Sequence, residues 1–93
     1  MNIQGWAFKS NELELRDKNT KRFKEIEHLY TNLGLNKKPC YGRCEFTGQL
    51  EGDEAMALSE FDIALLADRG NLCFGGSCSK GSNGSFSGTY NTD

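Results

Sequence analysis

Two pairs of cysteines are the residues of this sequence whose type and spacing most directly suggest chemistry. Three residues separate Cys40 from Cys44, and four separate Cys73 from Cys78. Each pair opens with cysteine, an aromatic residue and glycine. Short spacings with a glycine let both thiolates of a pair turn toward one ion, as a tetrahedral four-cysteine zinc site requires. The spacing therefore offers a zinc site as one interpretation of the four cysteines.

Other features of the same cysteines favour free thiols. Between the two pairs lie 28 residues, more than the roughly 15–20 that are usual in such a zinc site. Cys44 shares a face of a predicted strand with Phe46, and unpaired cysteine is among the most often buried residue types. Because we recognise no secretion signal, we expect a reducing compartment, in which disulfides are the least favoured state of the cysteines. We therefore expect no cofactor, with zinc bound by all four cysteines as the alternative.

No catalytic site is predicted. His28 is the one histidine, and it falls on the polar side of a predicted helix beside Glu25 and Glu27. Nucleophilic catalysis needs a histidine within reach of a serine or cysteine together with an orienting carboxylate, and no nucleophile motif accompanies this histidine. We therefore expect a surface histidine and a protein that is not an enzyme.

Charge is distributed unequally along the chain, although the net charge is only −2. Residues 1–43 carry nine basic and five acidic side chains, whereas residues 44–93 carry two basic and eight acidic ones. Such asymmetry indicates a charged partner, with two solvated faces as the alternative. The side chains predicted to bind a partner come from both halves: Arg16, Lys18, Lys21, Arg22, Lys24, Asp53 and Glu54.

The basic side chains are the preferred contact surface. Lys21, Arg22 and Lys24 fall on the first turns of a predicted helix, where the helix dipole disfavours cations. Local helix stability therefore does not explain them, whereas contact with phosphates or an acidic protein does. The competing mechanism is mimicry of phosphates by acids of the second half. Two of those acids, Glu60 and Asp62, are already explained as acids at a helix N-terminus.

The N-terminal half predicts one strand and one helix. Leu13 and Leu15 alternate with charged residues, which is the pattern of a half-buried strand. Between residues 21 and 33, apolar side chains recur at helical spacing, and Gly34 stands where a helix ends with a positive φ. Residues 36–39 contain the one proline of the chain and are predicted to form a loop.

The C-terminal half predicts a strand, a second helix and a hairpin. Ser59 followed three residues later by Asp62 indicates a capping box at a helix start, and Asn83-Gly84 is a strong signal for a hairpin turn. The predicted elements are a strand at 43–50, a turn at 52–54, a helix between Ser59 and Gly70, and a hairpin with strands at 71–79 and 85–92.

These elements predict a single α+β domain over residues 1–93. Two helices would pack on a small antiparallel sheet of three to five strands that ends in a C-terminal β-hairpin. The predicted core consists of Phe23, Ile26, Tyr30, Leu33, Phe46, Phe61, Leu65 and Phe74. No apolar run approaches the roughly 18 residues of a membrane span, and no signal peptide is recognised, so we expect a small intracellular domain without membrane contact.

One stretch resembles a group of small proteins from mobile elements. Residues 58–76 run a short helix into a glycine-rich strand, and a Gly/Ser-rich hairpin ends at residues 89–93. This arrangement is similar to small accessory proteins of phages and plasmids, among which anti-CRISPR proteins are the best-described functional group. The resemblance covers about a third of the chain and carries over no site residue.

The resemblance implies a function. Anti-CRISPR proteins are typically single small domains without catalytic residues that bind a CRISPR effector complex and block target DNA. We therefore expect a non-enzymatic inhibitor in the cytoplasm of a bacterial host, with a host protein or ribonucleoprotein complex as partner and nucleic-acid contact as part of that interaction. The alternative is a small zinc-stabilised module that binds nucleic acid.

Overall fold

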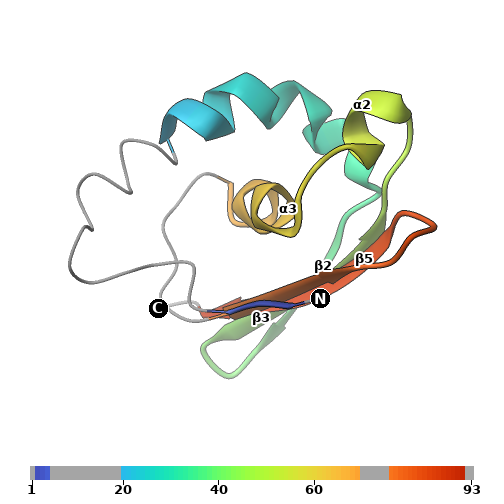
Figure 1. The fold of residues 1–93 in the computed structure, drawn as a ribbon. Helices are drawn as coiled ribbons and strands as arrows, with labels where there is room; N and C mark the ends of the chain where they lie inside the picture. The colour runs from blue at the N-terminus through green and yellow to red at the C-terminus, as the bar shows by residue number, and fades with distance from the viewer. Residues whose placement is uncertain (1, 5–19, 70–75, 92–93) are drawn as a thin grey trace.

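An antiparallel sheet with helices on one face forms the framework of the protein (Figure 1). The structure, a computed structural model, describes residues 2–4, 20–69 and 76–91. The strands in spatial order are β1 (Asn2–Gln4), β4 (Gly76–Lys80), β5 (Ser85–Asn91), β3 (Arg43–Gln49) and β2 (Asn36–Cys40). Neighbouring strands all run antiparallel. The predicted α+β fold with its C-terminal hairpin is therefore confirmed, and the described residues contribute five strands to the sheet.

The first helix is a composite of two helix types. Residues 20–26 are α-helical and continue without a break as a 3₁₀-helix, η1 (Glu27–Leu33). Gly34 follows with a φ of 54°, which confirms the predicted helix end. The apolar stripe is broader than predicted because Leu29 is also buried, whereas the rings of Phe23 and Tyr30 are only partly buried.

Two further helices follow β3. Residues 53–56, where the sequence predicted a turn at 52–54, form the single-turn helix α2 (Asp53–Met56). Acidic residues in a first turn suit the positive end of the helix dipole. The next helix, α3 (Glu60–Ala67), starts at the predicted capping box, in which the Ser59 hydroxyl accepts from the Asp62 N–H and the Asp62 carboxylate accepts from the Ser59 N–H.

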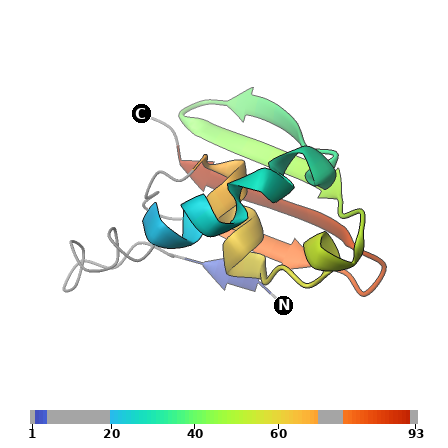
Figure 2. The same ribbon diagram turned by 90° about the horizontal axis from the view of Figure 1, so that it is seen from above.

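α3 lies between the first helix and the sheet, so the fold has three layers at its centre (Figure 1). It contacts β4 and β1 on one side and η1 on the other, and Figure 2 shows from above that both helices lie across the same face of the sheet. Every residue from Asp62 to Ala67 is buried. The sequence predicted one buried stripe that included Phe61, which is only partly buried. A helix enclosed from two sides has apolar residues all round.

The α3 helix ends earlier than predicted. Arg69 has a φ of 61° and donates its backbone N–H to the Leu66 carbonyl. The left-handed position that closes a helix is therefore Arg69, one residue before the predicted Gly70. Gly70 and the predicted core residue Phe74 lie outside the described residues, as does the strand predicted around Leu13 and Leu15.

Two phenylalanine–glycine pairs hold the centre of the sheet. Phe46 of β3 lies opposite Gly88 of β5, and Gly48 of β3 lies opposite Phe86 of β5. Both rings are buried, and their centroids are 6.1 Å apart. A Cβ added to Gly88 would stand 2.4 Å from the Phe46 ring, and one added to Gly48 would stand 2.3 Å from the Phe86 ring. Each glycine therefore makes room for the ring across from it.

β2 is the main departure from the sequence prediction, which placed a loop at residues 36–39. The strand pairs with β3 from Asn36↔Thr47 to Cys40↔Arg43. Its exposure is almost continuous, so no alternation of apolar residues revealed it. Cys40 and Arg43 flank a two-residue loop as a hydrogen-bonded pair, which leaves Pro39 at a non-bonded position. Proline fits there because its missing N–H faces the open edge.

Candidate functional site

The tip of the β2–β3 hairpin presents an exposed aromatic ring. The two loop residues, Tyr41 and Gly42, have φ angles of 42° and 75°. Positive φ at both central residues defines the tight turn that matches the twist of a two-stranded ribbon. Tyr41 has a relative exposure of 104%. Among the described residues, it is the large hydrophobic side chain that lies exposed on the surface. The turn therefore holds the ring entirely outside the fold.

Tyr41 is an unfavourable residue for this turn. Asparagine, aspartate and glycine are preferred at such positions, whereas other side chains with a left-handed backbone are strained by roughly 1–2 kcal/mol. The Tyr41 ring buries no surface that would offset this strain. Strained residues persist where the surrounding structure holds them, and they occur preferentially at functional sites. Folding alone does not explain a tyrosine here.

Three cations belong to the same β2–β3 hairpin as Tyr41. Lys37, Lys38 and Arg43 are all exposed. Register places Lys38 and Arg43 on the sheet face that no described helix covers, and Lys37 on the opposite face. The Lys37 ammonium lies 5.6 Å from the centre of the Tyr90 ring. One acid opposes them, since a terminal nitrogen of Arg43 lies 3.4 Å from a Glu45 oxygen. We call Lys37, Lys38, Tyr41 and Arg43 the hairpin surface.

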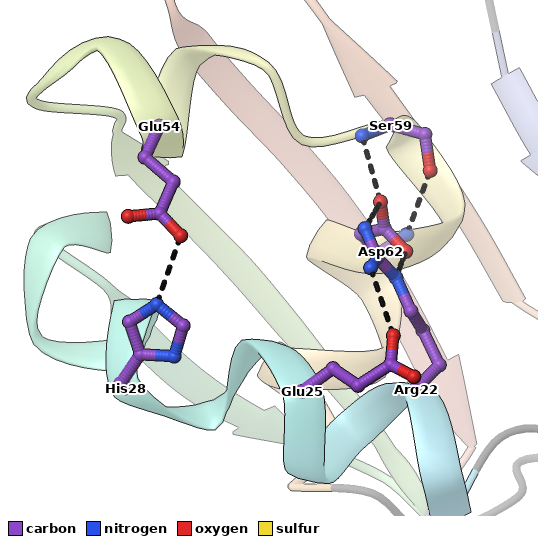
Figure 3. Close-up of polar contacts among 6 residues, drawn as sticks. All are labelled: Arg22, Glu25, His28, Glu54, Ser59 and Asp62. Carbon is purple, nitrogen blue, oxygen red and sulfur yellow. Dashed lines mark hydrogen bonds and ion pairs between the residues drawn. The ribbon is translucent and has the colours of Figure 1, made fainter.

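The predicted basic set is divided by the structure. Lys21 and Lys24 are exposed on residues 20–26, and Arg16 and Lys18 lie outside the described residues. Arg22, which the sequence predicted as a partner-binding cation, instead donates to both oxygens of Asp62 at 2.9 Å and 3.0 Å (Figure 3). It also contacts Glu25 at 3.3 Å. The tertiary fold therefore gives Arg22 an intramolecular role.

Asp62 joins this ion pair to the start of α3. Its carboxylate accepts from two Arg22 nitrogens and from the backbone N–H of Ser59 (Figure 3). Burial by itself would raise the pKa of Asp62, but the hydrogen bonds from Arg22 and Ser59 outweigh burial and lower that pKa. The hydrogen bonds that Arg22 donates to Asp62 in turn raise the pKa of Arg22. Each partner therefore favours the charged form of the other.

The predicted acidic binding residues lie at another corner of the molecule. Asp53 and Glu54 are exposed in the first turn of α2. A Glu54 oxygen lies 3.0 Å from Nε2 of His28, with 70% and 56% of the two side chains exposed (Figure 3). His28 is thus the surface histidine that was predicted, with a carboxylate neighbour. Contacts as exposed as this one contribute little to stability.

The described cysteines are not brought together. Cys40 is half-buried, and register places it on the uncovered sheet face, whereas Cys44 is buried on the face that the helices cover. Cys78 is buried on β4, which β5 separates from β3. Cys73 lies outside the described residues, and within the described ones no group of three or more metal-ligating side chains occurs. The zinc alternative required Cys40 and Cys44 to turn toward one ion, whereas the structure places these two thiols on opposite faces of the sheet.

Lys80, at the end of β4, is a partly buried cation that the sequence analysis did not single out. Its ammonium donates to the carbonyls of Met56 and Leu58 at 2.6 Å and 2.8 Å. These carbonyls lie at and just after the end of α2, where cations suit the helix dipole. Lys80 is therefore used to fasten β4 to α2 rather than to meet a partner.

Recognising β2 as a strand would have revealed the hairpin surface from the sequence. Cys40-Tyr41-Gly42-Arg43 then reads as two strand ends around a two-residue loop, with tyrosine at its tip. The signal was hidden because β2 is polar and contains Pro39. Among the helices described, none is both long and apolar enough to cross a membrane. Comparison with known proteins gives no match to a family model, a curated protein or a solved structure.

Proposed function

We propose that the protein is a non-enzymatic inhibitor that binds a host nucleoprotein complex, of the CRISPR-effector kind that the sequence resemblance implies, and that the hairpin surface makes the contact. The observation that supports this proposal is Tyr41, which has a strained backbone, is fully exposed and stands at the tip of a hairpin whose strands carry Lys37, Lys38 and Arg43. Aromatic residues and arginine dominate the energy of macromolecular interfaces. Cations beside them attract phosphates or acidic protein surfaces.

A binding role agrees with the arrangement of the reactive groups that are described. Acid–base chemistry uses sheltered groups whose pKa values are shifted toward the working pH. The contact of His28 with Glu54 is mostly exposed to solvent, and Cys44 and Cys78 are buried away from any substrate. The hairpin surface contains no acid–base pair, but it does contain the features of a contact surface.

The experiment measures inhibition of target-DNA binding by reconstituted CRISPR effector complexes of several types. Three charge-reversed variants separate the surfaces: Lys38→Glu/Arg43→Glu on the hairpin, Lys21→Glu/Lys24→Glu on the helix, and Asp53→Lys/Glu54→Lys on α2. We expect the hairpin variant to lose at least about tenfold in potency, as for interface residues of high energetic weight. Urea unfolding of each variant confirms that its fold is retained.

Other outcomes contradict this proposal in different ways. A loss confined to the α2 variant would identify acidic mimicry of DNA as the mechanism and remove the hairpin surface from it. A loss confined to the helix variant would assign the contact to Lys21 and Lys24. Absence of inhibition by the unmodified protein with every effector type would contradict the inhibitor function itself.

A further inference from the structure

We infer that the hairpin surface binds single-stranded nucleic acid directly, with the Tyr41 ring stacked on an unpaired base and with Lys38 and Arg43 on the neighbouring phosphates. This inference rests on the proposed function and names the part of a nucleoprotein complex that the protein would contact, which is its guide strand. It is stated for the protein alone, so it can be tested without any effector complex.

The ring is presented in a form suited to stacking. Both faces of Tyr41 are open to solvent at a relative exposure of 104%. Its backbone is fixed by the loop between Cys40 and Arg43, which pair with each other across the hairpin. A base can therefore stack on the ring without rearranging the fold. Base–aromatic stacking is the main sequence-independent contact in proteins that bind single strands.

Two cations share one face of the hairpin that carries Tyr41 at its tip. Lys38 lies opposite Glu45, and Arg43 is two residues from Glu45 along β3, so Lys38 and Arg43 are diagonal neighbours on one face. Diagonal neighbours in an antiparallel pair are about 7–8 Å apart. Glu45 opposes them but contacts Arg43 at 3.4 Å with nearly half of each side chain exposed, so a phosphate can displace it.

The neighbouring strands extend this face with short hydroxyl side chains. Register places Thr89 opposite Glu45 and Ser87 opposite Thr47 on the uncovered face of β5 and β3. The hydroxyl of Thr89 lies 3.5 Å from that of Ser77 on β4. Hydroxyls donate to phosphate oxygens and accept from sugar hydroxyls. A strand that leaves the tip along this face would meet these hydroxyls beside the single carboxylate of Glu45.

A single strand fits these features better than a duplex or an acidic protein. In a duplex the bases are already stacked on each other, so Tyr41 would have no free base to receive it. An acidic protein would use the cations but offers no unpaired base on which both open faces of the ring could stack. The combination of one open ring with adjacent cations is what single strands require.

The test measures fluorescence anisotropy of a labelled short oligouridine and of a duplex of the same length, with the purified full chain, at about 50 mM and about 200 mM salt. We expect binding to the single strand that exceeds binding to the duplex and weakens with salt. Tyr41→Asn should weaken single-strand binding about tenfold or more, and Tyr41→Trp should retain it. Asparagine suits the turn, so a loss in that variant would not reflect unfolding.

Matched arginine variants test the cations. Arg43→Gln should weaken binding. It should also reduce the magnitude of the slope of log K against log salt concentration by about 0.7, which is the contribution of one phosphate contact with a single strand. Arg69→Gln removes the same charge at the end of α3 and should leave both quantities unchanged.

Four results would overturn the inference. They are no binding to the single strand, equal binding to strand and duplex, no effect of Tyr41→Asn, and an equal effect of Arg69→Gln. If oligonucleotide binding is absent while effector inhibition still depends on Tyr41, the contact is with protein and the proposed function stands. If oligonucleotide binding is present without effector inhibition, the proposed function fails and this inference stands.

Discussion

Arg22 and Asp62 form a two-bond ion pair, 40 residues apart in sequence, that fastens the first helix to α3. The Asp62 side chain is only 10% exposed, whereas 43% of the Arg22 side chain remains accessible. The same carboxylate completes the capping box with Ser59. Two charges of a kind that suggests partner binding are therefore used to join two layers of the fold.

Replacing Arg22 should destabilise the protein without unfolding it. Arg22→Met keeps an unbranched apolar stem but leaves the largely buried Asp62 carboxylate without its charged donor. Hydrogen bonds to charged groups contribute about 1.5–3 kcal/mol, and partial exposure of Arg22 places the expected loss of unfolding free energy near the lower end. Urea denaturation measures this loss. Lys24→Met on the same helix is the control and should change stability by less than about 0.5 kcal/mol.

The same ion pair should make stability depend on pH in the acid range. The pKa of Asp62 is lower in the folded protein than its ordinary value. Such a group stabilises the fold above its unfolded pKa of about 3.9, and this contribution is lost as the pH falls through the folded pKa. We expect the urea concentration at the unfolding midpoint to decrease as the pH is lowered below about 4. The decrease should be smaller in Asp62→Asn. Parallel curves for the two proteins would contradict this origin.

Tyr41→Asn should stabilise the protein. Asparagine adopts the left-handed backbone at this turn position more readily than tyrosine does. Since the ring of Tyr41 buries nothing, relief of strain should raise the unfolding free energy by about 1 kcal/mol. Thermal or urea unfolding measures the gain. A stability loss would show that the turn needs tyrosine for folding, and would weaken the argument that the residue is kept for binding.

Gly88→Ala should be strongly destabilising. The new Cβ would stand 2.2 Å from the backbone oxygen of Ser77, 2.4 Å from the Phe46 ring and 3.0 Å from the Cys78 Cα. Backbone atoms on a paired strand cannot move aside easily, and overpacking of this kind costs about 1–3 kcal/mol or more. Gly81→Ala is the control, because its nearest neighbours are the side-chain oxygens of Asn83 and Ser85 at 3.0 Å and 3.1 Å. Equal urea midpoints for the two variants would contradict the close packing at Gly88.

The described thiols should react with alkylating reagents in a fixed order. Burial, with a smaller effect of Glu60, raises the pKa of Cys78 to about 12, so little thiolate forms at neutral pH. Cys40 is half-buried and should be labelled first, whereas Cys44 and Cys78 are buried and should follow only when the protein opens. Iodoacetamide labelling of the native protein, read by peptide mass spectrometry, gives the order. Labelling of Cys78 as fast as Cys40 would contradict it.

A chelator should leave these three labelling rates unchanged. The described thiols lie on three different strands, and Cys40 is on the sheet face opposite to that of Cys44 and Cys78. Metal-bound thiolates are protected until the ion is removed. Acceleration of Cys40 and Cys44 labelling by the chelator, together with stoichiometric zinc by elemental analysis, would instead favour the zinc-stabilised alternative.

The local elements of the protein were determined by the sequence itself. The capping box at Ser59, the left-handed Gly34, the alternation of Cys44 and Phe46, and the Asn83-Gly84 turn each involve residues within a few positions of one another. Hydrogen bonds and backbone preferences at this range act before any tertiary contact forms. For this reason the α+β class and the C-terminal hairpin could be predicted from the chain alone.

The tertiary structure alone decided which of these residues are buried, paired or presented to solvent. β2 forms because β3 offers a partner across a tight turn, although its own polar residues carry no strand pattern. Arg22 is held in an ion pair because α3 places Asp62 against it. Tyr41 is exposed because the pairing of β2 with β3 places it at the tip of their hairpin. The Arg22–Asp62 contact joins residues 40 positions apart, and the pairing of β2 depends on its place beside β3 in the sheet, so a pattern of neighbouring residues contains the energy of neither.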